Sequence, residues 1–296
     1  MNIAGLVYIL IIVGILSTMI FTNHKIRIVT NTYWFWLAIA GFCFIWVLSF
    51  RFIPDWITYW QNHATAYANP GDFANSKIIS RAFMLDACPC FFCLLTISLI
   101  ADPSRRLARI FAPIAIVGGM ITLSALISNS SDPNINAAFD AQFLFIGKGT
   151  ERCYFIMHFM QIAIGTGVLL NTPKSGWRVW IVSLGSFVVY LCYVAIMMSA
   201  TGCAWFTTGL SPNDYVNWGE QMGEYHVIRD LSHAPIYLCP LILIPVLTAF
   251  GFAIGIALKN FVFCRWIWVF GNAKSNDWTR YWNYKKFSNK VDKAWW

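Results

Sequence analysis

The sequence predicts an all-α fold, a polytopic transmembrane helix bundle of about seven spans with the N-terminus outside and the C-terminus inside. Composition is the first observation, because 58% of the residues are hydrophobic, only 11% are charged and the mean hydropathy is +0.58. Soluble domains carry about 25% charged residues. The second observation is that several apolar runs reach the about 20 residues with which an α-helix crosses a bilayer. Alternating segments typical of a transmembrane β-barrel are absent from the sequence.

Seven apolar runs form a predicted membrane domain over residues 1–258, which a cytoplasmic tail over 259–296 follows. The first run has no basic segment before it and no small-residue cleavage site, so it is predicted to stay in the mature chain. Prolines and glycines inside the runs are compatible with membrane helices, because neighbouring helices satisfy the freed backbone groups. The predicted spans are 3–21, 34–53, 79–101, 110–127, 153–170, 179–200 and 234–258.

The distribution of charge predicts the orientation of the bundle. Most basic residues follow the first, third, fifth and seventh spans, whereas most acidic residues lie in the connections on the other side. Cytoplasmic loops are enriched in lysine and arginine, so the C-terminus is expected inside and the N-terminus outside. The three long outer connections, 54–77, 128–152 and 201–233, are expected to form short interfacial helices and loops. This pattern favours the plasma membrane of a bacterium, with an organelle membrane as the alternative.

The tail over 259–296 alternates aromatic and basic residues. Because it follows a span directly, we expect a helix that lies among lipid headgroups. Membrane lipids are therefore the first expected partner, and other membrane protein subunits are the second. No nucleic acid is expected, although aromatic and basic residues also occur together where bases stack.

The third and fifth predicted spans carry polar residues in an apolar setting. An ionisable group such as Asp86 costs about 2.5–3.5 kcal/mol at the centre of a membrane, so it needs a partner or a wet cavity. Asp86 and Cys88 lie seven and nine residues after Ile79, a depth of about 10–14 Å. His158 lies six residues after Arg152, about 9 Å deep. We therefore expect Asp86, Cys88 and His158 to share one level of the bundle.

Pro89 is expected to open the helical turn that holds Asp86 and Cys88. It cannot donate a hydrogen bond to the carbonyl of Leu85, and its ring pushes that turn apart. The Leu85 carbonyl is then expected to be free. Arg81 is expected either to pair with Asp86 or to extend to the outer headgroups.

These residues form the candidate catalytic site. Cys88 would be the nucleophile and His158 the base that takes its proton, with Asp86 or the Leu85 carbonyl orienting the imidazole. In the alternative interpretation the cysteine only packs and the histidine only bonds a neighbouring helix. Metal binding is not expected, since the thiols of Cys88, Cys90 and Cys93 point to different helix faces, and no cofactor is expected.

Other polar residues are predicted to be structural. Cys153 and Cys203 lie near outer ends of spans and could form a disulfide. His226 and His233 are expected to bond within an outer loop. Tyr190 and Tyr193 on the sixth span are expected to pack and not to relay protons.

Three short motifs give the chain a resemblance to a known family. The runs Cys153-Tyr-Phe-Ile-Met-His158-Phe, Met84-Leu-Asp-Ala-Cys88 and Pro235-Ile-Tyr237 resemble, in order and spacing, motifs of the YwaF-like integral membrane proteins. Animal relatives of that family include a transmembrane acyltransferase. The resemblance implies that Cys88 and His158 play the roles of a membrane cysteine and histidine, and either Cys88 or Cys90 corresponds to the family's cysteine. Where the family has a histidine near this cysteine, the present chain has Ala87 and Pro89.

Three functions are consistent with the sequence. The first is a membrane subunit that anchors or assembles a larger complex, indicated by the aromatic and basic tail and the aromatic outer connections. The second is a divergent lipid acyltransferase or hydrolase that uses Cys88 and His158. The third is a transporter or receptor that binds a small cationic ligand at Asp86, although the repeats typical of transporters are missing.

Overall fold

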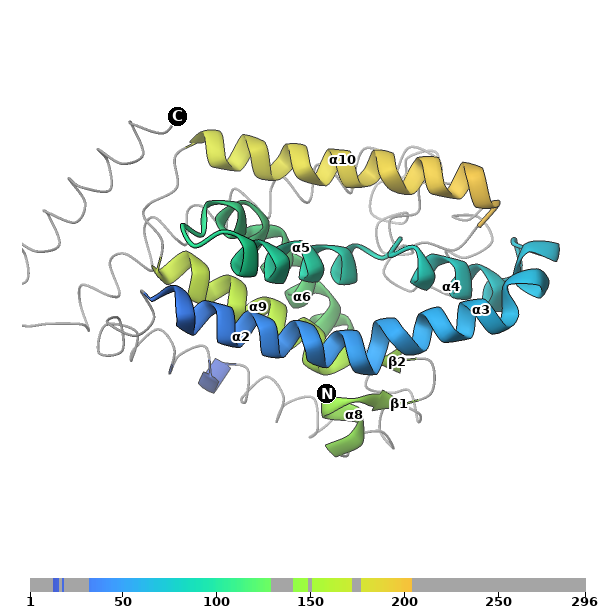
Figure 1. The fold of residues 1–296 in the computed structure, drawn as a ribbon, viewed down its shortest axis with the longest axis horizontal. Coiled ribbons are helices and arrows are strands. Elements are labelled where there is room, and N and C mark those ends of the chain that lie inside the picture. The colour runs from blue at the N-terminus through green and yellow to red at the C-terminus, as the bar shows by residue number, and fades with distance from the viewer. Residues whose placement is uncertain are drawn as a thin grey trace, which may run out of the picture.

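A computed structural model describes residues 13–15, 18, 32–128, 141–148, 151–171 and 177–203. These residues are helical apart from a two-stranded hairpin, as the sequence predicts (Figure 1). The last predicted span, the tail, His226 and His233 lie outside the described residues, as does nearly all of the first predicted span.

One long helix opens the described core, and a shorter helix runs back along it. The long helix consists of α2, a π-helical turn called η1, and α3, and Thr32 caps its start by accepting the Phe35 N–H. Asp72 caps α4 by accepting two backbone N–H groups, and α5 follows after a break. The bounds are α2 Tyr33–Val47, η1 Leu48–Phe52, α3 Ile53–Ala68, α4 Phe73–Ala82 and α5 Ala87–Ala101.

Four further helices complete the bundle, and a small antiparallel hairpin precedes one of them, α9. Helix α6 lies in the interior, where it contacts α5, α9 and α10. Helix α10 runs along the bundle beside α5 and α4 (Figure 1). The bounds are α6 Arg106–Ser128, α8 Ala141–Phe145, β1 Gly147–Lys148, β2 Glu151–Arg152, α9 Tyr154–Asn171 and α10 Trp177–Thr201.

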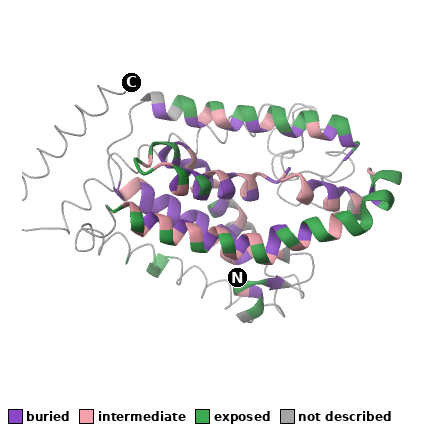
Figure 2. Ribbon diagram, viewed as in Figure 1, coloured by how far each residue is buried: buried purple, intermediate pink, exposed green. Residues whose placement is uncertain are grey.

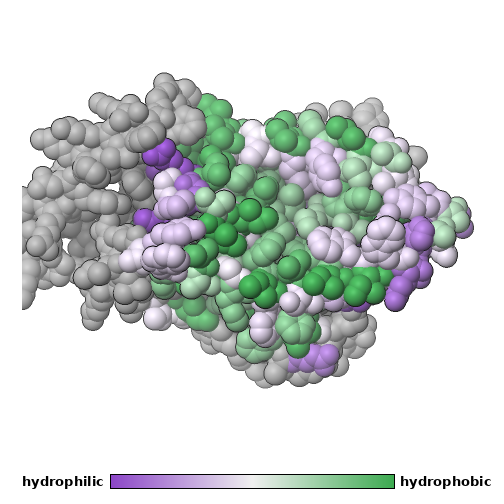
Figure 3. Space-filling model, viewed as in Figure 1, coloured by the Kyte–Doolittle hydropathy of each residue, from purple (hydrophilic) through white to green (hydrophobic). Residues whose placement is uncertain are grey.

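Four helical stretches in the described part are long and apolar enough to cross a membrane. They match the predicted spans 34–53, 79–101, 153–170 and 179–200, while the predicted span 110–127 forms α6. Figure 3 shows hydrophobic side chains across the middle of the visible face and hydrophilic ones toward the two ends of the long axis. The stretches are Tyr33–Ala68, Ala74–Ala101, Tyr154–Asn171 and Ile181–Thr201.

Two groups of buried side chains hold these helices together. Figure 2 shows that most of α9 is buried, whereas buried and exposed residues alternate along α10. The first joins α2, α5, α6 and α9 and includes Val47, Phe92 and Met157. The second joins α10 to α3, α4, α5 and α6, and it includes Phe91, whose ring centre lies 5.4 Å from that of Tyr190. The α3–α4 hairpin therefore packs on α10, whereas α2 packs on α5.

The long helix that α2, η1 and α3 form differs from the sequence prediction, in which the second span ended at Ile53. It continues to Ala68 and has 36 residues, which corresponds to about 54 Å. The hydrocarbon core of a bilayer is only about 30 Å thick. Pro54 is the second residue of α3, and the turn before it, where a proline ring interferes with α-helical hydrogen bonding, is the π-helical η1. The helix therefore passes a proline that was expected to begin a loop.

Helices α6 and α9 approach each other closely at glycine residues. A Cβ atom added to Gly119 would lie 2.8 Å from the carbonyl oxygen of His158, and one added to Gly165 would lie 2.7 Å from Ile116 Cγ1. Small residues permit such close approach of helix backbones in membranes, where apolar area alone does not drive association.

We predict that Gly119→Ala lowers the thermal stability of the protein in detergent. The added methyl group meets a backbone carbonyl that cannot rotate away, and overpacking of this kind costs about 1–3 kcal/mol. Gly185→Ala on α10 is the matched control, because no atom lies within 4 Å of its added Cβ. The control should be neutral or slightly stabilising, since alanine favours a helix by about 1 kcal/mol over glycine. Equal melting temperatures for the two variants would contradict the close packing.

Asp102 organises the connection between α5 and α6. Its carboxylate accepts hydrogen bonds from the backbone N–H groups of Ser104, Arg106 and Leu107, at 2.9, 2.7 and 3.1 Å, and from the Ser104 hydroxyl. Two of these N–H groups belong to the first turn of α6, where helix geometry leaves them without an intrahelical acceptor. Partial burial raises the pKa of Asp102, but the hydrogen bonds outweigh it and lower the pKa below its ordinary value of 3.8.

The contribution of Asp102 to stability should depend on pH. A carboxylate whose pKa is lower in the folded state stabilises the fold above its unfolded pKa of about 3.9, and this stabilisation is lost as pH falls through the folded value. We expect Asp102→Ala to cost about 1 kcal/mol at pH 7, the usual loss for a helix-capping residue. The difference in melting temperature between wild type and variant should narrow below about pH 4. A difference that stays constant from pH 7 to pH 3 would refute this role.

Candidate functional site

The third predicted span is interrupted before Asp86, not opened at Pro89. Helix α4 ends at Ala82, and Met84 adopts a left-handed backbone conformation with φ +53°. Asp86 is the extended residue that precedes α5. Pro89 lies in the first turn of α5, where a helix needs no N–H from it. The prediction of a proline kink was therefore wrong in its position.

The break exposes backbone carbonyl groups, and aromatic side chains from other helices bond to three of them. The indole N–H of Trp56 donates to the carbonyl of Ala82 at 3.1 Å, and the Tyr193 hydroxyl donates to that of Phe83 at 2.6 Å. The Tyr190 hydroxyl donates to the Leu85 carbonyl. Tyr190 is also buried, so it packs as predicted, but the expectation of a free Leu85 carbonyl was wrong.

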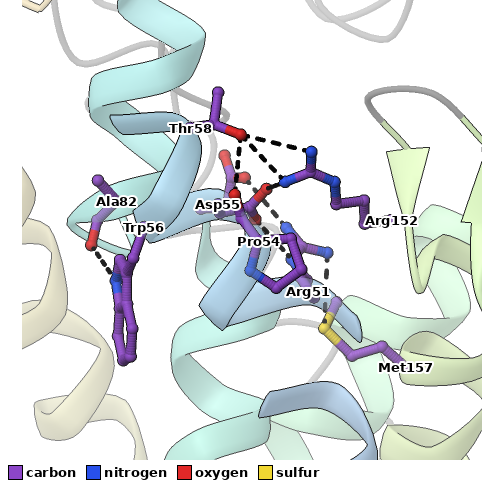
Figure 4. Close-up of polar contacts among 9 residues, drawn as sticks. Arg51, Pro54, Asp55, Trp56, Thr58, Ala82, Arg152 and Met157 are labelled. Atoms are coloured by element: carbon purple, nitrogen blue, oxygen red, sulfur yellow. Dashed lines mark hydrogen bonds and ion pairs between the residues drawn. The ribbon is translucent and has the colours of Figure 1, made fainter. Parts of the chain in front are cut away.

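Asp86 belongs to a chain of ion pairs that links three parts of the fold, and Figure 4 shows its members Arg51, Asp55 and Arg152. Its Oδ2 lies 3.6 Å from Nη2 of Arg51 in η1, and Arg51 Nε lies 3.9 Å from Oδ2 of Asp55 in α3. Asp55 Oδ1 lies 2.9 Å from Nη1 of Arg152 in β2. Arg51, Asp55 and Asp86 are 7%, 5% and 8% exposed, so these charges are largely removed from solvent and depend on one another.

Neighbouring polar atoms complete the surroundings of the two arginines. Arg51 Nη1 lies 3.6 Å from the thioether sulfur of Met157, and the Arg152 guanidinium lies 3.4 Å from the Thr58 hydroxyl oxygen (Figure 4). The sequence interpretation gave no role to Arg51 and considered only Arg81 as a partner for Asp86. The spacing of Arg51 and Asp55, four residues apart on one helix, was the signal that could have revealed this chain.

The ion pairs lie about halfway along the long helix that α2, η1 and α3 form. Tyr33 donates its hydroxyl to the Ile100 carbonyl, so the start of α2 and the end of α5 lie together. Arg51 is 18 residues after Tyr33, or about 27 Å along the helix, and 17 residues before Ala68. Charges placed this far from the ends of an apolar bundle need partners of opposite charge, and the ion pairs supply them.

Cys88 and His158 lie on helices that touch each other. The Cys88 sulfur lies 3.5 Å from the Thr122 hydroxyl oxygen of α6, and the Gln161 amide of α9 donates to the Cys88 carbonyl. His158 precedes Gln161 by one helical turn and is buried, and its Nδ1 faces the Tyr154 carbonyl oxygen. The first turn of α5 and the N-terminal half of α9 therefore meet at these residues. The catalytic roles of Cys88, His158 and Asp86 stay a hypothesis.

Cys153 and Cys203 do not form the disulfide that the sequence left open. The Cys203 thiol instead donates to the Ser76 carbonyl of α4 at 3.3 Å. Cys153 is buried beside Arg152 and has a left-handed backbone conformation with φ +53°.

We predict that Arg51→Met strongly destabilises the protein. The change leaves two buried carboxylates without their shared cation, and breaking a buried ion pair from one side costs about 3–5 kcal/mol. Asp86→Asn should therefore cost less in the Arg51→Met background than in wild type, with a coupling energy of about 0.5–3 kcal/mol. Thermal unfolding of the four proteins in detergent measures this coupling, and Arg106→Met at an exposed position of α6 is the control. Additive effects would show that Arg51 and Asp86 do not interact.

Comparison with known proteins places the chain among bacterial relatives. It is 28% identical over 233 residues to the uncharacterized protein MG135 of Mycoplasma genitalium, covering 74% of this chain and 75% of that protein. It is 29% identical over 232 residues to the MG135 homolog of Mycoplasma pneumoniae, with the same coverage of each chain. No solved structure matches.

A family model identifies the chain more firmly. The matching family is not that of the YwaF-like proteins, so the resemblance inferred from short motifs gains no support here. The model covers residues 9–292, nearly the whole chain. The protein belongs to DUF5378, a family of unknown function.

Proposed function

We propose that this protein is a non-catalytic subunit of a larger assembly in the plasma membrane of a bacterium. Four apolar helices long enough to span a bilayer support the membrane location, and the Mycoplasma relatives support a bacterial one. The observation that carries the subunit role is the ion-pair chain, in which Asp86 pairs with Arg51.

This pairing weakens the case for catalysis. The catalytic hypothesis needs Asp86 or the Leu85 carbonyl to orient the His158 imidazole. Asp86 faces Arg51, the Leu85 carbonyl accepts the Tyr190 hydroxyl, and His158 Nδ1 faces the Tyr154 carbonyl. Each group named for that role thus has a structural contact already.

The same pairing weakens the case for a receptor or transporter of small cations. A cationic ligand would have to compete with Arg51 for Asp86, and the guanidinium is held in place by its second carboxylate neighbour, Asp55. A ligand that displaced Arg51 from Asp86 would take one carboxylate away from a buried guanidinium, which is costly.

An exposed aromatic surface on α3 supports a protein partner. About 17 residues separate Arg51 from Ala68, so α3 extends about 25 Å beyond the level of the ion pairs. Trp60 is 71% exposed and Tyr67 is 40% exposed on this extension. Tryptophan and tyrosine are enriched in the energetically important parts of protein interfaces. We therefore place the docking surface for another membrane subunit on this extension.

Cysteine-dependent acyl transfer is the second candidate function. The observation in its favour is the bond from the Gln161 amide to the Cys88 carbonyl, which joins the helix of His158 to the turn that carries the thiol. The hydroxyl of Thr122 beside the Cys88 sulfur adds a polar neighbour to this turn.

Purification from native membranes in mild detergent tests the proposal. We expect the tagged wild-type chain to retain a stoichiometric membrane protein partner, and Trp60→Ala to lose it. Trp34→Ala, which removes an equally exposed tryptophan at the other end of the same helix, should retain it. A stable wild-type monomer would contradict the subunit role. Lipid profiles altered in both Cys88→Ser and His158→Gln, with the partner still bound, would favour acyl transfer instead.

A further inference from the structure

We infer that α3 and α4 form a hinged hairpin, which the Arg51–Asp86 ion pair latches against the rest of the bundle. The hairpin comprises residues 53–82, and α3 packs along α4. Two chain segments join it to the bundle, η1 on the α2 side and residues 83–86 on the α5 side. Both segments are irregular, while the helices on either side of them are regular.

Each of the two junctions departs from regular helix, and each is a point at which the chain can bend. A π-helical turn holds one residue more than an α-helical turn, and such turns occur frequently at functional sites. Its conversion to α-helix rotates everything beyond it about the helix axis by roughly the 100° that one residue spans. At the second junction, Met84 occupies a left-handed conformation that non-glycine residues seldom adopt. The hairpin therefore has a hinge at each of its two attachments.

The latch connects the two hinges directly. Arg51 lies in η1 and Asp86 ends the second junction, and their charged groups are 3.6 Å apart. The hairpin is also tied to the bundle by the closer pair between Asp55 of α3 and Arg152 of β2. Rotation at η1 would carry Arg51 and Asp55 apart from these partners, so the ion pairs select one state of the hinge.

Helix α10 provides the surface on which the closed hairpin rests. Tyr193 bonds to the Phe83 carbonyl, and the Cys203 thiol after the end of α10 bonds to the Ser76 carbonyl of α4. Ala66 of α3 and Ile79 of α4 are fully buried in the same group of side chains as Tyr190, Val194 and Met198 of α10. Opening would separate these surfaces and release the first turn of α5, which carries Cys88.

Hydrogen–deuterium exchange of the full chain in lipid nanodiscs tests the hinge. We expect Tyr193→Phe to raise the exchange rate across residues 54–82 about fivefold, since one hydrogen bond that holds the closed state is lost. Asp86→Asn should have the same effect or a larger one. Exchange in α6 and α9 should not change. Tyr33→Phe is the matched control, because it removes a tyrosine bond to the Ile100 carbonyl at the opposite end of α5 and should leave the hairpin unchanged.

A disulfide lock separates hinge motion from local unfolding. A Cβ atom added to Gly202 lies 3.5 Å from Pro70 Cβ, within the range that disulfides use, and the φ of +68° at Gly202 adds strain to a cysteine there. The lock is tested in a Cys203→Ser background that carries Pro70→Cys and Gly202→Cys. In the oxidised protein, Asp86→Asn should not raise the exchange rate of residues 54–82. Reduction of the disulfide should restore the faster exchange. Faster exchange in α6 and α9 to the same extent as in the hairpin would overturn the inference. Faster exchange of the hairpin on Asp86→Asn in the oxidised protein would also overturn the inference.

Discussion

The ion pair between Arg51 and Asp86 is the constraint on which the arrangement of the helices depends. Neither charge is tolerated in an apolar bundle alone, so η1 and the start of α5 must lie side by side. That requirement fixes where α2 gives way to α3 and where α4 gives way to α5. Asp55 and Arg152 extend the same constraint to the turn before α9. The position of α9 then follows, together with the placement of His158 near the first turn of α5.

The need of backbone carbonyl groups for hydrogen-bond donors explains why aromatic residues surround the break between α4 and α5. Carbonyl groups released from a helix inside a membrane have no water to bond, so other parts of the protein must supply donors. Trp56 and the two tyrosines of α10 supply them, each with a ring that packs and a polar atom that bonds. The break between α4 and α5 is therefore stable. The hydrogen bonds from the two tyrosines, together with its apolar face, hold α10 along α4 and α5.

The sequence predicted the helices better than the contacts between them. The length of the apolar runs located α5, α9 and α10, because the thickness of a bilayer sets the length of a helix that crosses it. The continuation of the α2–η1–α3 helix to Ala68 was missed, because a proline such as Pro54 ordinarily ends a helix. No local sequence pattern reveals a π-helical turn. Asp86 was recognised as a costly charge, but its partner lies 35 residues earlier, and pairing between helices leaves no periodic signal. Pro89 was assigned to a kink, but a proline suits the first turn of a helix equally well, and the sequence alone does not distinguish the two.

Two kinds of attraction hold the bundle together along its length. Between helices that lie in lipid, apolar side chains gain little by touching one another, so close packing and polar contacts decide the arrangement. Gly119 and Gly165 serve that purpose where α6 meets α9. The α3–α4 hairpin rests on α10 through the second group of buried apolar side chains, which includes Ile79 and Val194. The ion pairs lie beside both packed regions and tie them together, because an unpaired charge is costly in an apolar bundle.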